Sequence, residues 1–160
     1  MPDARVKLLI VDDDVPSRKH LAVLFSELGY CVRSVRDGAS ALSEIRHEFP
    51  DMLLSELNMI GMSGVEFLLA VRRLFPSIRV VVMSGASSGT CVPPGIAADA
   101  FLEKGPGLTL LIKTLDAMIQ PGRAPSRQRS VECSTWISSA RAVPASPVAT
   151  VSDKGLIACQ

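Results

Sequence analysis

The sequence predicts an α/β fold built on a doubly wound parallel sheet. Short apolar runs that end in polar residues recur along the chain, and segments with helical spacing separate them. Strands buried on both faces of a parallel sheet form such nearly continuous apolar runs. Alternating strands and helices with short connections place helices on both faces of the sheet. Five such units fill residues 5–120, and 48% apolar residues suffice for one core.

The five predicted strands share runs of Val, Leu, Ile, Met or Phe. They are expected at residues 6–11, 30–35, 52–56, 79–83 and 100–103. Pro50 precedes the third strand, where a proline interrupts no ladder.

The helices are predicted from spacing and from end signals. Pro16 suits a first helical turn, and Gly29 is a helix stop. Asp37 is expected to cap a helix that runs through Glu48. A third helix opens at residues 63–64, and the last spans 108–119.

The segment between the fourth and fifth strands predicts an irregular or shortened fourth helix. It contains Gly89, Pro93, Pro94 and Gly95. Prolines and glycines oppose a regular helix. We therefore expect a loop or one short turn over residues 86–94.

Residues 121–160 form a tail rich in Ser, Pro, Ala and Arg, which we expect to be mostly disordered. Such a composition buries too little apolar surface to offset the entropy of ordering. Two short stretches are candidate docking segments: residues 131–137 around Trp136, and residues 156–158. The alternative is an inert tail.

Bulk properties exclude several function classes. The chain has 17 basic and 16 acidic residues and only 4% aromatic residues, so nothing favours direct nucleic-acid binding. No apolar stretch approaches the ~18 residues of a membrane span. The amino-terminal residues do not resemble a secretory signal, so a cytoplasmic location is expected.

Polar side chains follow four of the apolar runs. They are Asp12 and Asp13, Glu56, Ser84, and Lys104. In open parallel sheets, sites form beyond the carboxyl ends of the strands. These side chains are therefore expected to converge on one pocket.

Several motifs together resemble the receiver domain of two-component response regulators. They occur in order at residues 11–14, 50–59, 61–64, 83–86 and 98–104. The resemblance covers residues 5–120 and implies a flavodoxin-like (βα)5 sheet of strand order 2-1-3-4-5. It also implies Mg²⁺-assisted phosphoryl transfer from a phosphohistidine to an aspartate.

The resemblance assigns roles residue by residue. Asp12, Asp13, the carboxylate at position 56 and the backbone carbonyl of Asn58 would hold the metal ion, since Mg²⁺ prefers oxygen ligands. Ser84 and Lys104 would each contact a phosphoryl oxygen. Phe101 occupies a switch-aromatic position, with a plain strand-core role as the alternative.

The main departure from the family pattern is Glu56, which stands at the phosphoacceptor aspartate position. The extra methylene moves the carboxylate by roughly 1–1.5 Å. A misplacement of ~1 Å can cost ~100-fold in rate. We therefore expect impaired phosphorylation, no enzymatic activity, and Mg²⁺ binding that is weakened or absent.

Three readings of Glu56 stay open. A functional phosphoacceptor could use Glu56 with Mg²⁺. The longer carboxylate could also reach Lys104 and Ser84 and partly imitate a phosphorylated state, or it could pair with Lys104 without any switching. Two further departures lie nearby: Ile60 and Gly105 stand at family proline positions, and Pro106 is displaced by one residue from the second of them. The loop of residues 105–107 is expected to be looser, so Lys104 is predicted to be less well aimed.

The expected partners are a sensor histidine kinase or phosphotransfer protein, a downstream effector protein, or both, with a homodimer as a further option. No output domain fits within the tail. A distant alternative is a flavodoxin-like small-ligand or flavin-binding protein. Against that alternative, the sequence has no phosphate-cradling glycine loop after the first strand.

Overall fold

The computed structural model describes residues 5–85, 98–105 and 107–119. The predicted irregular fourth helix over residues 86–94, the displaced Pro106 and the tail 121–160 lie outside these residues.

Five parallel strands form one sheet in the order β2-β1-β3-β4-β5, which confirms the predicted topology. The strands are β1 (Lys7–Val11), β2 (Cys31–Val35), β3 (Met52–Glu56), β4 (Arg79–Gly85) and β5 (Ala100–Lys104). Leu8 to Val11 pair with Met52 to Ser55 at the centre of the sheet. β3 is buried along its whole length, as expected of a central parallel strand.

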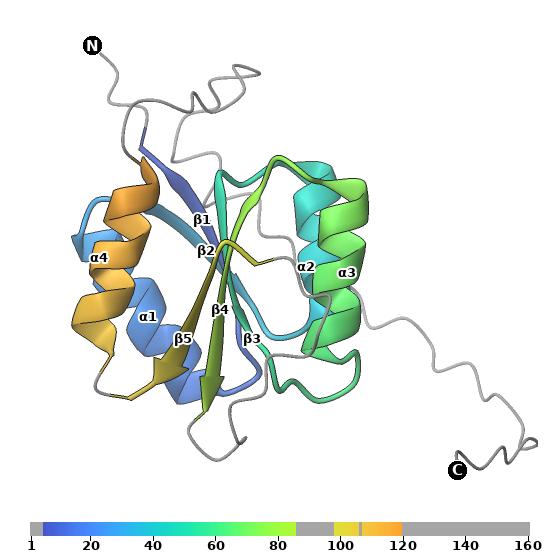
Figure 1. The fold of residues 1–160 in the computed structure, drawn as a ribbon, viewed down its shortest axis with the longest axis horizontal. Coiled ribbons are helices and arrows are strands. Elements are labelled where there is room, and N and C mark those ends of the chain that lie inside the picture. Colours follow the sequence, from blue (N-terminus) through green and yellow to red (C-terminus); the bar gives the residue numbers. More distant parts are fainter. Residues whose placement is uncertain (1–4, 86–97, 106, 120–160) are drawn as a thin grey trace, which may run out of the picture.

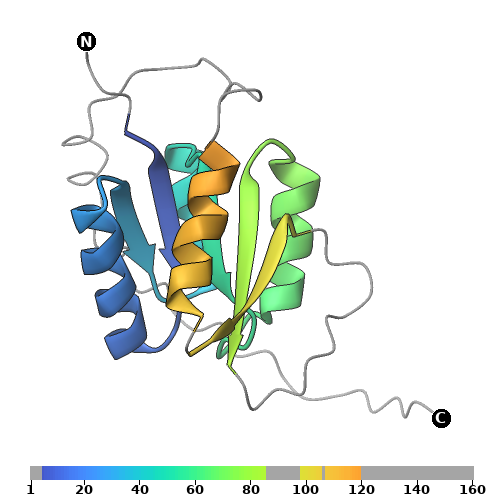
Figure 2. The same ribbon diagram turned by 60° about the vertical axis from the view of Figure 1, so that its left-hand side comes forward.

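Helices cover both faces of the sheet (Figure 1). They are α1 (Val15–Glu27), α2 (Gly38–His47), α3 (Gly64–Leu74) and α4 (Leu108–Ile119). α1 and α4 lie side by side on one face, and α2 and α3 lie on the other (Figure 2).

Local signals begin and end the helices where the sequence predicts. The Asp14 side chain accepts from the Ser17 backbone N–H (2.8 Å), and Pro16 lies in the first turn of α1. The Asp37 carboxylate caps α2 in the same way. Gly29, with φ of 94°, ends α1 in the left-handed region that glycine tolerates best.

The sheet divides the core into two clusters. On the α1/α4 face, Ile10, Leu54 and Phe25 are fully buried. On the α2/α3 face, Leu9, Leu53 and Phe67 are fully buried. Alternate side chains of each strand therefore serve opposite clusters, as the two-residue period of a strand requires.

β4 and β5 each extend beyond their predicted ends. β4 runs through Gly85 and β5 through Lys104, because Ser84 pairs with Glu103 and Gly85 with Lys104. The extra pairs bring Ser84 and Lys104 onto regular strand backbone at the carboxyl edge. Among the described residues, no helix is long and apolar enough to span a bilayer.

Candidate functional site

The carboxyl edge of the sheet carries a buried charged cluster, which we call the Lys104 cluster: Asp12, Glu56 and Lys104. Asp12 follows β1 directly, Glu56 is the last residue of β3, and Lys104 is the last residue of β5. Asp12 is 0% exposed and Glu56 is 4% exposed. The sheet therefore brings together three side chains that lie far apart in the sequence.

Lys104 bridges the two carboxylates. Its Nζ lies 2.7 Å from Asp12 Oδ2 and 2.6 Å from Glu56 Oε2. Only 25% of the Lys104 side chain is exposed. One ammonium thus contacts both acids at hydrogen-bond distance, in surroundings that screen charge less than water does.

The protonation of Lys104 reflects this position. Burial alone would lower the pKa of the ammonium, but hydrogen bonds and charges from Asp12 and Glu56 outweigh burial and raise the pKa above its usual value. Lys104 is therefore a fixed cation at neutral pH.

The second oxygen of Glu56 is held by backbone. Glu56 Oε1 accepts from the N–H groups of Leu57 (2.8 Å) and Asn58 (3.0 Å). Both carboxylate oxygens of Glu56 therefore have hydrogen-bond partners, as a buried charge requires. The contact with Asn58 uses its backbone donor, whereas the family resemblance assigned a role to its carbonyl.

Asp12 is fixed by residues of α1 that the sequence analysis missed. The Ser17 hydroxyl donates to Asp12 Oδ2 (2.8 Å), and the Arg18 guanidinium donates to the Asp12 carbonyl (2.6 Å). The Asp14 N–H donates to Asp12 Oδ1 (2.9 Å). The cap at Asp14 was a usable signal, since it places residues 17 and 18 in the first turn, beside the end of β1.

Asp13 does not join the Lys104 cluster. Its Oδ2 accepts from the Ile60 backbone N–H (3.1 Å), which ties the β1–α1 loop to the β3–α3 loop. The Ile60 side chain is 86% exposed. The departure from proline at position 60 therefore supplies an N–H that a proline lacks.

Ser84 and Phe101 lie near the cluster without touching its charges. The Ser84 hydroxyl donates a long hydrogen bond to the Gly85 carbonyl (3.5 Å). Among the described residues Ser84 has no hydrogen bond to Glu56 or Lys104. Phe101 is half-buried and packs against the α2/α3 core cluster.

Gly64 sets the loop that follows Glu56. Its N–H donates to the Leu57 carbonyl (3.1 Å), and a Cβ at position 64 would lie 2.2 Å from that oxygen. Ser63 and Glu66 form a reciprocal capping box at the start of α3. A side chain at position 64 would thus displace the residue next to Glu56.

The acids that the resemblance assigned to a metal ion each face another partner in this structure. Carboxylate oxygens are the right donors for Mg²⁺. However, the described residues hold no group of three acidic or other metal-ligating side chains. Asp12 and Glu56 face the Lys104 ammonium, and Asp13 faces the Ile60 N–H.

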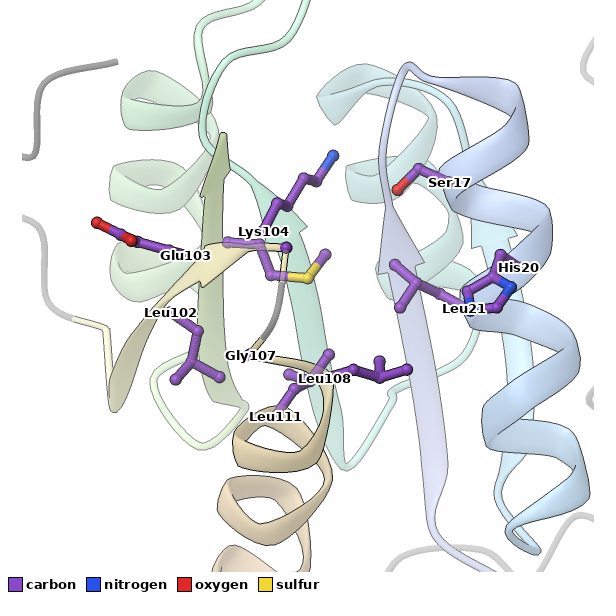
Figure 3. Close-up of a pocket in the computed structure, with 11 residues that line it drawn as sticks. Ser17, His20, Leu21, Leu102, Glu103, Lys104, Gly107, Leu108 and Leu111 are labelled. Atoms are coloured by element: carbon purple, nitrogen blue, oxygen red, sulfur yellow. The ribbon is translucent and has the colours of Figure 1, made fainter. Parts of the chain in front are cut away.

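A cavity of about 180 Å³ lies next to Lys104, between α1 and the start of α4. Lys104 and Ser17 stand at one end, and Leu108 and Leu111 at the other (Figure 3). Glu103 also borders the cavity, but its carboxylate points away from Lys104 (Figure 3). The cavity therefore adds apolar surface to the site and no further carboxylate.

The fold and these residues define a class of protein. Residues 8–116 match the model of the response regulator receiver domain family. The chain belongs to this family, the receiver domains of two-component response regulators.

Similarity to curated proteins is consistent with this family. The chain is 34% identical over 116 residues to the transcriptional regulatory protein ZraR of Klebsiella oxytoca, covering 72% of this chain and 25% of that protein. It is 35% identical over 78 residues to sporulation initiation phosphotransferase F of Bacillus subtilis, covering 49% of this chain and 63% of that protein. The chain thus spans about a quarter of the length of ZraR.

Solved structures agree on the fold. The chemotaxis protein CheY4 of Vibrio cholerae superposes with a TM-score of 0.65 at 27% identity, over 72% of this chain and all of that chain. The response regulator TrrA of Thermotoga maritima, solved with Mg²⁺ and BeF, gives 0.66 at 22% identity, over 71% of this chain and 99% of that one.

Proposed function

We propose that this chain is a receiver module with impaired phosphorylation that signals through protein contacts. The observation that carries the proposal is the Lys104 cluster. Glu56 stands at the acceptor position of the family pattern, and both of its oxygens are engaged.

The engaged carboxylate is a poor nucleophile toward phosphorus. An attack by Oε2 would require it to leave the Lys104 ammonium at 2.6 Å. An attack by Oε1 would break two backbone hydrogen bonds. Catalysis of phosphoryl transfer is mostly positioning and charge stabilisation, so both routes raise the barrier.

The same contacts favour one arrangement of Lys104. The Glu56 carboxylate, 2.6 Å from the ammonium, holds the lysine side chain across the carboxyl edge from β5. One carboxylate carries less charge than a phosphoryl group, which has about 1.5–2 charges and three acceptor oxygens. We therefore propose that Glu56 holds Lys104 in one fixed position. This state does not fully imitate the phosphorylated one, because the Ser84 hydroxyl bonds to the Gly85 carbonyl and not to Glu56 or Lys104.

The proposed partners follow from family membership. They are a sensor histidine kinase or phosphotransfer protein, a downstream effector, or both, and we place the chain in the cytoplasm with them. TrrA has been solved in complex with the histidine kinase ThkA. We propose no enzymatic activity and no direct binding to nucleic acid or membrane.

Phosphorylation by acetyl phosphate with Mg²⁺, followed by intact mass, tests the proposal. Wild type and Glu56→Asp are compared, with Glu56→Gln as a control for labelling at other sites. We expect no added phosphoryl group on wild type and a gain on Glu56→Asp. The shorter side chain withdraws the carboxylate from Lys104 and restores the family's geometry.

The competing function is a working phosphoacceptor that uses Glu56. Stoichiometric labelling of wild type that is lost in Glu56→Gln would establish that function and overturn ours. If wild type and Glu56→Asp both stay unlabelled, the proposed cause is wrong, because the block then lies beyond Glu56.

A further inference from the structure

We propose that residues 131–137 of the tail dock through Trp136 onto a partly exposed aromatic pair at the amino edge of the sheet. The pair is Phe49 and Phe75. This inference does not depend on phosphoryl chemistry, since the pair lies at the edge opposite the Lys104 cluster.

The aromatic pair is preformed and accessible. The two rings meet edge to face, with centroids 5.2 Å apart. Phe49 is 51% exposed, Phe75 is half-buried against the α2/α3 core cluster, and Leu74 beside it is 49% exposed. The other ring pair of the described residues, Phe25 with Tyr30, is buried. An exposed aromatic pair is the type of surface that binds another apolar group.

Backbone contacts hold both phenylalanines in place. Phe75 caps the carboxyl end of α3: its N–H donates to the Val71 carbonyl (2.7 Å), and its carbonyl accepts from the Ile78 N–H (3.2 Å). Phe49 lies between Glu48, which ends α2 and pairs with Lys7 (2.7 Å), and the buried Pro50. Such a surface therefore loses little conformational freedom when a ligand binds to it.

The tail starts at the correct edge. Helices that connect parallel strands run against them, so α2, α3 and α4 all end at the amino edge (Figure 1). Residues 120–131 follow α4 and can span up to about 40 Å when extended. A tethered segment of this length has an effective concentration in the millimolar range, so weak contacts are enough.

Charge favours this segment as the occupant. The last turns of α2 and α3 carry Arg46, His47 and Arg73, beside Arg72, which already pairs with Asp99 (2.6 Å). Residues 131–137 contain one acid, Glu132, and no lysine or arginine, whereas the rest of the tail is basic. Glu132 would face the basic helix ends while Trp136 contacts the rings.

Tryptophan fluorescence tests the proposal directly, because Trp136 is the only tryptophan of the chain. Acrylamide quenching and the emission maximum are measured on the full 160-residue chain, with the urea-unfolded chain as the reference. We expect Trp136 to be protected in wild type and exposed in Phe49→Ser. The loss of one ring contact should lower the docking equilibrium constant about tenfold.

Two controls keep the test decisive. Val23→Ser removes another exposed apolar side chain, on α1, and should leave Trp136 protected. If circular dichroism shows that Phe49→Ser is unfolded, Glu132→Arg replaces it, since that change leaves the described fold intact. It should expose Trp136, because it replaces an acid with a positive charge beside the basic helix ends.

Three results would overturn the proposal. Wild-type Trp136 could be quenched as readily as in urea, so that no docking exists. Its protection could survive a folded Phe49→Ser, or Glu132→Arg where Phe49→Ser does not fold, so that it docks elsewhere. Its protection could rise with protein concentration, so that a second copy supplies the surface.

Discussion

A single lysine decides the chemistry of this site. Two buried carboxylates would repel each other without a cation between them, and Lys104 supplies that cation from the end of β5. Removing one partner of a buried ion pair leaves an uncompensated charge, which costs more than the pair contributes. The cluster is therefore an electrostatic unit, and each residue depends on the other two.

The raised pKa of Lys104 predicts a stability loss at alkaline pH. An unfolded lysine releases its proton near pH ~10.4, while the folded one keeps it to higher pH. The folded state then binds more protons, so the free energy of unfolding falls as pH rises. Below that range the contribution of Lys104 is fully present.

Urea unfolding of wild type and Lys104→Met between pH 8 and pH 11 measures this loss. We expect wild type to be more stable by about 2–3 kcal/mol at pH 8, and the difference to shrink above about pH 10. Tyr30 also has a raised pKa, from burial and from its hydrogen bond to Asp116. Its contribution is the same in wild type and in Lys104→Met, so it cancels in the difference between them. A difference that stays constant to pH 11 would refute the role of the pair.

At the scale of elements, Gly64 links the start of α3 to the end of β3. Its missing side chain lets its N–H reach the Leu57 carbonyl, next to Glu56. The Leu57 N–H in turn holds Glu56 Oε1. The entry into α3 thus controls the position of the carboxylate.

Gly64→Ala is expected to lower the free energy of unfolding by about 1–3 kcal/mol, because the new methyl group would collide with backbone. Gly61→Ala is the comparison in the same loop. No atom lies within 4 Å of a Cβ there, so only the positive φ of 96° opposes it. Thermal melts followed by circular dichroism compare the two, and an equal or smaller loss for Gly64→Ala would contradict this view of the loop.

Sequence patterns predicted the elements well because the period of apolar residues and the caps are local signals. Asp37 and Gly29 begin and end helices where expected. The ends of β4 and β5 were missed, since the pairing of Ser84 with Glu103 depends on a neighbour distant in sequence. The same holds for the partners of the site: Lys104 and Glu56 were predicted to lie close, but the contacts of Ser17 and Arg18 with Asp12 were not.

At the scale of the whole molecule, one sheet supports two separate apolar clusters. Phe25 is fully buried on the α1/α4 face and Phe67 on the α2/α3 face. Each strand contributes side chains to both clusters, so neither face can unfold without exposing the other. We expect the described domain to unfold in one transition.

Phe25→Ala and Phe67→Ala test this coupling. Each should cost about 3–5 kcal/mol, because a large buried ring is replaced by a cavity. Far-ultraviolet circular dichroism and near-ultraviolet absorbance should give coincident urea transitions for both variants. Two separated transitions in either variant would mean that the faces are independent.

A double-mutant cycle between Glu56 and Lys104 measures how strongly the lysine holds the carboxylate. Urea unfolding at pH 7.5 is measured for wild type, Glu56→Gln, Lys104→Met and the double variant. Glu56→Gln with Arg73→Met serves as the control pair, because Arg73 lies in the last turn of α3, at the opposite edge of the sheet. We predict a coupling energy of about 1–3 kcal/mol for Glu56 with Lys104 and additivity for the control. A coupling within about 0.3 kcal/mol of zero would contradict the claim that Lys104 holds Glu56 in place.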